Sequence, residues 1–375
     1  MNFKRGLGFL LLVLGLKLAY YAFYIFCFYA FDLAHSSEGF NTIYQLFQRN
    51  DWGWYNVIIS KGYSVAHSAA EIGCCGGEHF KQSEWAFFPF YPLLVRFTML
   101  IFHLNSTMAA FWLSVILAWG ALWVFYGCCM DLFGFEDKKA VKATLLFALL
   151  PFNYYLHVYY TEALFFLLVG GSFWAIKKEK LALMSLLVAM MVLTRPNGLV
   201  LLLPLFVFLV SLEPDLQKNY KKLMAKCLWL LSGPVVFGLY CCYQYIMTGQ
   251  FFAFSIAQRG WCRYLTLPYH AFFRDETWVC AFNSAYTLLV IGFWLYNHKK
   301  LTLPMNILVA VSLLLPLCTG SVQSMARFIP LIFPLAILFS EQFKPGWKNT
   351  FALIILFGLQ LWSFYFWIVS DPMSY

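Results

Sequence analysis

Residues 6–31 read GLGFLLLVLGLKLAYYAFYIFCFYAF, an apolar run interrupted by a single charge, Lys17. A helix that crosses the ~30 Å hydrocarbon core of a bilayer needs ~20 mostly apolar residues. Lys4 and Arg5 precede the run, and no small-residue cleavage site follows it. The run therefore predicts an uncleaved first membrane span rather than a signal peptide. Lys17 is expected to face the interior of a helix bundle or to extend toward the interface.

The whole chain has the same apolar character as this run. Of its 375 residues, 62% are hydrophobic and 11% are charged, and the mean hydropathy is +0.70. Soluble domains are near 45–50% apolar and ~25% charged. The composition excludes a soluble globular domain, a disordered chain and a small disulfide scaffold. The net charge of +9 is better explained by membrane topology than by a nucleic-acid partner.

Further apolar runs follow the first one along the chain. They cover residues 107–131, 140–153, 159–176, 181–194, 197–212, 227–247, 283–297, 302–318, 327–341 and 350–370. Together with the first run they predict an all-α polytopic membrane protein of about 11 spans. We expect residues 1–375 to form a single integral membrane domain.

Short lysine-rich turns between the runs predict the orientation. They are Lys138/Lys139/Lys142, Lys177/Lys178/Lys180, Lys218/Lys221/Lys222/Lys226, Lys299/Lys300 and Lys344/Lys348. All of these turns are cytoplasmic if segment 86–104 lies along the outer interface instead of spanning the membrane. The N-terminus is then inside, and the large extracytoplasmic loops are 32–106 and 248–282.

The arginines are distributed differently from the lysines. Seven of the eight lie on or near the outer side in this topology. Because Arg binds phosphate with two parallel hydrogen bonds, an outward group of arginines indicates an anionic ligand such as a lipid phosphate. The alternative is that each arginine anchors a lipid headgroup separately.

Two carboxylates on the outer side are candidates for chemistry. Asp51, within Arg49-Asn50-Asp51-Trp52-Gly53, could act as a general base that removes a proton from a hydroxyl; a helix cap is the alternative. Glu162 begins a predicted helix, with Thr161 as its cap, where the helix dipole favours a carboxylate. An ionisable residue at membrane depth is nevertheless a functional candidate.

Metal and disulfide chemistry are less clearly indicated. Asp51, Glu84 and Glu162 could hold Mn²⁺ or Mg²⁺ only if they converge. Cys74, Cys75, Cys262 and Cys280 fall outside in this topology; a Cys262–Cys280 bridge is one candidate, but pairing is not readable from sequence. The chain has no Walker A loop, Rossmann fingerprint or GxSxG motif. We therefore expect any activated substrate to arrive from the membrane.

Four short elements, in this order, resemble the PIG-V-like mannosyltransferases of the glycosyltransferase-C superfamily. They are Asp51 with Tyr55, Val57 to Ile59 and Gly62-Tyr63; Phe87-Phe88-Pro89-Phe90-Tyr91-Pro92-Leu93; Tyr160-Thr161-Glu162-Ala163-Leu164-Phe165; and Arg195-Pro196-Asn197-Gly198. The resemblance covers residues 45–205 well and the remainder by layout. One departure is Asn50, where the family usually has Trp.

The resemblance implies an inverting glycosyltransferase (EC 2.4) that takes a sugar, mannose by default, from a polyprenyl-phosphate donor on the extracytoplasmic face. Its acceptor would be a glycan, a glycolipid or a protein. Asp51 and Glu162 would be the catalytic residues. The residues expected to bind the donor phosphate and sugar are Arg195, Arg327, Arg259, Arg263, Tyr55, Glu84, His157 and Asn197. The chain length favours a bacterial relative in the inner membrane, with the endoplasmic reticulum as the eukaryotic location.

Two other classes of function remain open from sequence. A transporter or flippase for lipid-linked sugars would need charges along a path through the membrane, and here Lys17 is nearly alone at depth. A non-catalytic membrane assembly subunit would keep the fold without needing Asp51.

Overall fold

A computed structural model of the chain describes residues 3–30, 42–75, 80–213, 215–274, 276–343 and 347–374. Within these residues every regular element is a helix, and β pairing is limited to an isolated bridge between Cys74 and Lys81. This agrees with the all-α prediction. Residues 32–41 and 76–79 of the predicted first loop lie outside the described residues, as does Lys344.

Five of the described helical segments are long and apolar enough to cross a membrane. They include the first run and support an integral membrane protein. One is Lys4–Ala30 in α1 (Phe3–Ala30), and the second is α6 (Ser106–Asp131). The third, Lys218–Thr248, runs through α12 (Leu216–Leu228), η5 (Trp229–Leu231) and α13 (Ser232–Thr248). The last two are Trp278–Lys300, in α15 (Trp278–Asn297) and η8 (His298–Lys300), and Asn349–Ile368, in α19 (Trp347–Ile368).

The other predicted spans contain shorter helices, so the number of spans stays a prediction. They are α7 (Asp137–Ala148), α8 (Glu162–Lys177), α9 (Leu181–Thr194), α10 (Asn197–Val200), α11 (Leu202–Ser211), α16 (Leu303–Leu317), α17 (Met325–Phe328), η9 (Ile329–Leu331) and α18 (Phe333–Ser340). The helix is interrupted within the predicted span 327–341. Pro330 and Pro334 lack the amide proton that a helix interior needs, and the segment breaks into three pieces.

Short helices form the two loops that are predicted to be extracytoplasmic, called the outer loops below, and the remaining connections. They are α2 (Ile43–Leu46), α3 (Asp51–Lys61), α4 (Ala69–Ile72), η3 (Glu84–Ala86), α5 (Phe90–Phe102), η4 (Asn153–Leu156), α14 (Ala253–Ala257), η6 (Gln258–Trp261), η7 (Pro268–Phe272) and η10 (Pro372–Ser374). With 13 residues, α5 is about 20 Å long at 1.5 Å per residue. Tyr91 and Val95 are buried while Phe97 and Leu100 are exposed, so this helix has one packed and one open side. The interfacial placement of 86–104 stays a prediction.

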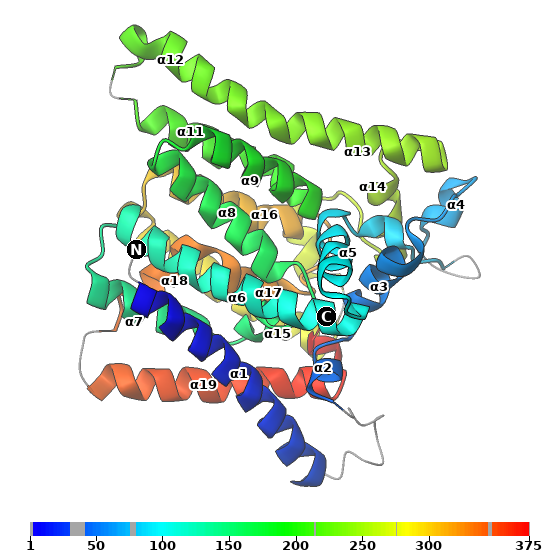
Figure 1. The fold of residues 1–375 in the computed structure, drawn as a ribbon, viewed down its shortest axis with the longest axis horizontal. Helices are drawn as coiled ribbons and strands as arrows, with labels where there is room; N and C mark the ends of the chain where they lie inside the picture. The colour runs from blue at the N-terminus through cyan, green and yellow to red at the C-terminus, as the bar shows by residue number, and fades with distance from the viewer. Residues whose placement is uncertain are drawn as a thin grey trace.

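The helices run side by side, with different sequences at the two ends of the bundle (Figure 1). The N-terminus, α7 and α12 lie at the left of the view, whereas α3, α4, α5 and α14 lie at the right. The left end therefore carries lysine-rich turns, and the right end carries the loop helices. This separation matches the one-sided charge distribution read from the sequence.

The centre of the bundle is built on α6, which packs along α8 and on which α1 also rests. Gly170 of α8 makes the close approach possible. A Cβ atom at this position would lie 2.7 Å from Cγ1 of Val124 in α6. Small residues let membrane helices approach closely, and van der Waals contact then replaces the hydrophobic effect as the attraction between them.

Lys17 faces the interior of the bundle, as one of its two predicted placements requires. Its side chain is buried and its ammonium group donates hydrogen bonds to Ser114 Oγ at 2.9 Å and to the carbonyl of His157 at 2.7 Å. The rings of Phe47 and Phe111 lie within 4.8 Å of the same nitrogen. Lys17 thus ties α1 to the turn that precedes Glu162.

Candidate functional site

Glu162 lies at the centre of a buried group of charges. It is the first residue of α8 and is fully buried. The turn before Glu162 includes η4 and begins at Phe152, whose backbone is left-handed with φ of +67°. The residues of this turn are themselves buried. Irregular backbone at membrane depth requires such protein cover. A buried carboxylate also requires charged or hydrogen-bonding partners.

Two arginines donate to the same oxygen of Glu162. The Nε of Arg327 lies 2.5 Å from Oε1, and a terminal nitrogen of Arg195 also donates to this atom. The other oxygen, Oε2, has no hydrogen-bond partner among the described residues. One oxygen of this carboxylate is therefore a buried acceptor without a donor.

Arg327 also connects Glu162 to Asp51. Its terminal nitrogen donates to Oδ2 of Asp51 at 2.8 Å, and the side chains of Arg327 and Asp51 are 7% and 25% exposed. The guanidinium lies 4.4 Å from the ring centre of Tyr160 and 5.2 Å from that of Tyr155. A planar cation can bind two carboxylates and aromatic faces together. The break in the 325–340 segment places Arg327 on the short helix α17. The side chain of Asn283 holds this helix, because its Oδ1 accepts a hydrogen bond from the backbone amide of Ala326.

Arg195 is positioned by the turn between α9 and α10. Its Nε donates to the hydroxyl oxygen of Thr161 at 2.7 Å. A Cβ atom on Gly198 would lie 2.7 Å from the carbonyl oxygen of Met191, so only glycine lets α10 fold back so closely onto α9. Thr161 had been assigned as a helix cap, but its side chain makes no cap hydrogen bond. It instead accepts from Arg195.

Asp51 is the first residue of α3, and its carboxylate pairs with Arg327 rather than capping the helix. Four residues later, Tyr55 places its hydroxyl 3.4 Å from Oγ1 of Thr161. The Tyr55 ring packs edge-on against Phe87 and Tyr91, with ring centres about 5 Å apart. Burial raises the pKa of Tyr55, so this phenol stays protonated.

Three of the predicted site residues lie outside this cluster. Glu84 is buried in the first loop, where its carboxylate accepts from the amide of Ser64 at 2.7 Å. His157 packs its ring against Tyr20 on the side of the turn that faces Lys17. Arg259 is exposed and borders a pocket beside the disulfide. Their expected roles in donor binding therefore stay predictions.

Asn197 and Arg195 both line a largely apolar pocket next to the cluster. Further lining residues are Phe165, Val169, Leu308 and Phe328. The guanidinium of Arg195 lies between the rings of Phe165 and Phe328, about 5.5 Å from each centre. The pocket thus joins an apolar surface to a cation.

Arg263 adds a third cation to the site. Its charge interacts with those of Asp51, Arg195 and Arg327, and burial lowers its pKa, although a guanidinium still remains protonated at neutral pH. Within the described part of the chain, its side chain makes no ion pair or hydrogen bond. Counted together with Arg195 and Arg327, Arg263 makes the local charge positive, which favours an anionic ligand.

The carboxylates do not form the metal site considered from sequence. Glu84 lies apart from Asp51 and Glu162, and these two are joined by the guanidinium of Arg327. Among the described residues no group of three or more His, Cys, Asp or Glu side chains is placed to hold a metal ion. The residues present do not fit the Mn²⁺ or Mg²⁺ site that was considered.

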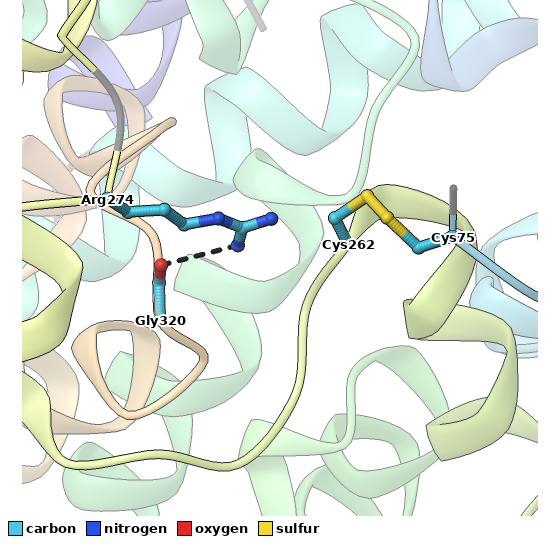
Figure 2. Close-up of a disulfide and its surroundings, with 4 residues drawn as sticks. All are labelled: Cys75, Cys262, Arg274 and Gly320. Atoms are coloured by element: carbon cyan, nitrogen blue, oxygen red, sulfur yellow. Dashed lines mark hydrogen bonds between the residues drawn. A yellow bond between two sulfur atoms is a disulfide. The ribbon is translucent and has the colours of Figure 1, made fainter. Parts of the chain in front are cut away.

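The disulfide differs from the pairing considered from sequence. Cys262 is bonded to Cys75 (Figure 2), with Cα atoms 5.3 Å apart, and not to Cys280. The two outer loops are therefore linked across 187 residues of sequence, a pairing that spacing cannot reveal because the fold brings the two loops together.

Compared with known families and with curated proteins, the chain matches none. Among solved structures it is similar to an Archaeoglobus fulgidus oligosaccharyltransferase determined in complex with Zn and sulfate, with a TM-score of 0.45, 12% identity and coverage of 88% of this chain and 48% of that one. It is similar to the same degree to the archaeal oligosaccharyltransferase AglB of that organism in complex with an inhibitory peptide and a dolichol-phosphate, with a TM-score of 0.45, 12% identity and coverage of 87% and 52%. The chain spans about half the length of these structures. At this TM-score the likeness does not decide the function.

Proposed function

We propose that this protein is an integral-membrane glycosyltransferase of the glycosyltransferase-C type. It transfers a sugar, with mannose as the expected one, from a polyprenyl-phosphate donor to a hydroxyl of a glycan, glycolipid or protein acceptor. Transfer takes place on the extracytoplasmic face of the membrane and inverts the anomeric carbon.

One observation carries this proposal: polar residues from separate sequence elements meet in a single cluster. Asp51, Glu162 and Arg195 belong to three elements of the family resemblance, and Arg327 bridges the two carboxylates. The fourth element contributes Phe87 and Tyr91, which pack against Tyr55 beside the cluster. Elements that merely anchored the chain separately at the interface would have no reason to converge.

The chemistry follows from the charges. Asp51 is the more exposed carboxylate and takes the proton of the acceptor hydroxyl, while the oxygen of that hydroxyl forms a bond to the anomeric carbon. The bond between the anomeric carbon and the phosphate oxygen breaks, and the polyprenyl phosphate leaves with the bonding electron pair. Arg195, Arg263 and Arg327 stabilise the negative charge that develops on this phosphate. The unpaired Oε2 of Glu162 accepts a hydrogen bond from the sugar or the acceptor.

The apolar pocket beside Arg195 suits the lipid part of such a donor. An isoprenoid chain offers methyl groups and double bonds but no hydrogen-bonding groups, and the pocket walls are aromatic and aliphatic. Arg195 lies where the phosphate at the end of that chain would be. A soluble sugar nucleotide would gain little from these walls.

The test is sugar transfer by purified protein in lipid nanodiscs, with a panel of radiolabelled polyprenyl-phosphate sugars that includes mannose. We expect transfer from at least one donor, and we expect Asp51→Asn to reduce kcat by about 100-fold or more, the usual contribution of a general base. Glu71→Gln is the matched control, because Glu71 is an exposed carboxylate in the same loop, where it accepts from the amide of His67.

Two results would contradict the proposal in different ways. Transfer by Asp51→Asn at nearly the wild-type rate would remove Asp51 from the chemistry. Failure of the wild-type protein to transfer any sugar of the panel, under conditions in which it remains folded, would favour a transporter or an assembly subunit.

A further inference from the structure

The helix that carries Asp51 begins without a cap from its own sequence. Asp51 is the first residue of α3, and the side chain of the residue before it, Asn50, makes no cap hydrogen bond. The backbone of Asn50 has φ of +48° and ψ of −108°, a combination that residues other than glycine seldom adopt. Such a conformation persists where surrounding contacts enforce it, and it is most frequent near active sites. A contact from outside α3 is therefore needed to hold the start of this helix.

The phenol of Tyr160 makes that contact. Its hydroxyl donates to the carbonyl of Arg49 at 3.0 Å and accepts from the backbone amide of Asp51 at 3.3 Å. These two hydrogen bonds lie on either side of Asn50 in the sequence. The amide of Asp51 is among those at a helix N-terminus that have no partner inside the helix. Tyr160 thus does for α3 what a cap residue does, although it lies 109 residues away in the chain.

The ring of the same side chain supports the partner of Asp51. The guanidinium of Arg327 lies 4.4 Å from the centre of the Tyr160 ring, and Arg327 donates to the carboxylate of Asp51 at 2.8 Å. An aromatic face attracts a cation placed over it. Tyr160 therefore contacts both members of this ion pair, one through its hydroxyl and the other through its ring.

Tyr160 itself has little freedom to move. Its side chain is buried, and its ring packs against Trp367 of α19, with ring centres 5.5 Å apart. On the same residue, the ring of Tyr155 lies stacked with its centre at 6.0 Å. A side chain that packing locks in one orientation can hold a functional group in a fixed geometry. The Tyr160 hydroxyl is therefore a fixed point for residues 49–51.

We infer that Tyr160 is a positioning residue for sugar transfer, whose hydroxyl holds Asp51 where its carboxylate can take the proton of the acceptor. The inference rests on the proposed function. A displacement of a reacting group by about 1 Å can lower a rate by about 100-fold. The loss of this hydroxyl should therefore slow the chemical step, and it should leave donor binding unchanged because the ring beside Arg327 remains.

The experiment compares two tyrosine-to-phenylalanine variants of the full-length protein in nanodiscs. Tyr160→Phe keeps the ring against Arg327 and removes the hydroxyl that bridges residues 49 and 51. Tyr155→Phe is the matched control, because the ring of Tyr155 also lies near Arg327, at 5.2 Å, while its hydroxyl has no hydrogen-bond partner within the described residues. We expect kcat for sugar transfer to fall by about tenfold in Tyr160→Phe and by less than about twofold in Tyr155→Phe.

Two further measurements separate positioning from a general loss of structure. In the Asp51→Asn background, Tyr160→Phe should lower the residual rate by less than about twofold, because the base that the hydroxyl positions is already absent. A hydroxyl that only stabilised the fold would lower the rate by the same factor in both backgrounds. The Kd for farnesyl phosphate, a short polyprenyl phosphate, should stay within about twofold of the wild-type value in Tyr160→Phe.

Amide hydrogen exchange tests the contact without requiring sugar transfer. We expect Tyr160→Phe to raise the exchange rate at the start of α3, in residues 51–54, by about threefold or more, because local opening becomes easier there. Exchange within α8, which follows Tyr160 in the chain, should stay unchanged. Tyr155→Phe should exchange like the wild type in both places.

Each outcome decides between the claims. If Tyr160→Phe transfers sugar as fast as Tyr155→Phe, or if its defect multiplies with that of Asp51→Asn, the positioning role is overturned and the proposed function stands. Unchanged exchange at the start of α3 in Tyr160→Phe would overturn the inference whether or not the wild type transfers sugar. A wild type that transfers no sugar, with exchange at the start of α3 raised in Tyr160→Phe alone, would overturn the proposed function and leave the contact between Tyr160 and α3 supported.

Discussion

The two ends of the helix bundle use ion pairs in opposite ways. At the lysine-rich end, Lys178 pairs with Asp131 at 2.6 Å, and their side chains are 41% and 28% exposed. At the other end, Arg327 pairs with Glu162 at 2.5 Å, and the side chains are 7% and 0% exposed. The two ion pairs have similar lengths, but the first is exposed to solvent and the second is buried.

This difference separates anchoring from function. Exposed pairs contribute little to stability because water and salt screen them. Buried pairs carry a large desolvation cost, so that a packed apolar group in the same place would often be as stable. A chain that buries Glu162 and Arg327, with Asp51 and Arg195 half-buried beside them, is therefore expected to keep this group for something other than stability.

The sharpest test of the comparison removes one cation from each end. Arg327→Met leaves Asp51 and Glu162 without their shared partner and should lower the free energy of unfolding by about 3–5 kcal/mol. Lys178→Met is the matched control at the exposed end, with an expected loss below about 1 kcal/mol. Denaturant unfolding in mild detergent measures both, and equal losses would mean that the two ends do not differ in this respect.

A smaller effect is expected from Thr161, which accepts from Arg195 at 2.7 Å. Thr161→Val leaves that buried donor without an acceptor and should cost about 1–3 kcal/mol of stability. Thr161→Ser keeps the hydroxyl and should retain most of the wild-type stability and donor affinity. A serine variant as impaired as the valine variant would indicate that the methyl group, and not the hydroxyl, matters here.

The smallest expected effect is the pH dependence of stability that comes from an ion pair at the exposed end. Asp137 precedes the apolar part of α7, and its hydrogen bond from Arg5 holds the pKa of that carboxyl below its ordinary value of 3.8. The pair therefore stabilises the folded state at neutral pH, and this contribution disappears as the pH falls below about 4, through the lowered pKa. Thermal unfolding across this range should be slightly less pH-dependent in Asp137→Asn than in the wild type. An unchanged profile would show that the pair contributes nothing.

Removal of metal should have no effect, since Arg327 occupies the position between Asp51 and Glu162 that a divalent ion would need. Sugar transfer after treatment with EDTA should stay within about twofold of the untreated rate, a change below about 0.5 kcal/mol. Loss of activity that Mn²⁺ or Mg²⁺ restores would contradict this interpretation of the buried end.

The sequence predicted the position of the candidate site along the helices better than it predicted which residues form the site. Asp51, Glu162, Arg195 and Arg327 were all placed near the outer ends of apolar runs, and these four meet. His157 and Glu84 have equally suitable depths but point elsewhere, because position along a helix does not determine the direction around its axis. Hydropathy alone also could not show that the segment carrying Arg327 breaks into short pieces.

Other features depended on contacts between segments far apart in sequence. The partner of Cys262 is set by the way the two outer loops pack, and Cys75 and Cys280 are equally plausible from spacing. Thr161 was recognised as the neighbour of Glu162 but not as an acceptor for Arg195, because that hydrogen bond requires the turn after α9 to fold back. The number of spans likewise cannot be counted from helices shorter than a bilayer.

Lys17 imposes an order of events on the assembly of the protein. Its two hydrogen-bond acceptors, Ser114 and the carbonyl of His157, lie 97 and 140 residues further along the chain. A ribosome makes the first helix long before it makes either of them, and a lysine at the centre of a lone helix costs about 2.5–3.5 kcal/mol on translocon-insertion scales. The span that carries Lys17 is therefore expected to reach its final place only after α6 and the turn before Glu162 are in position to receive its ammonium group.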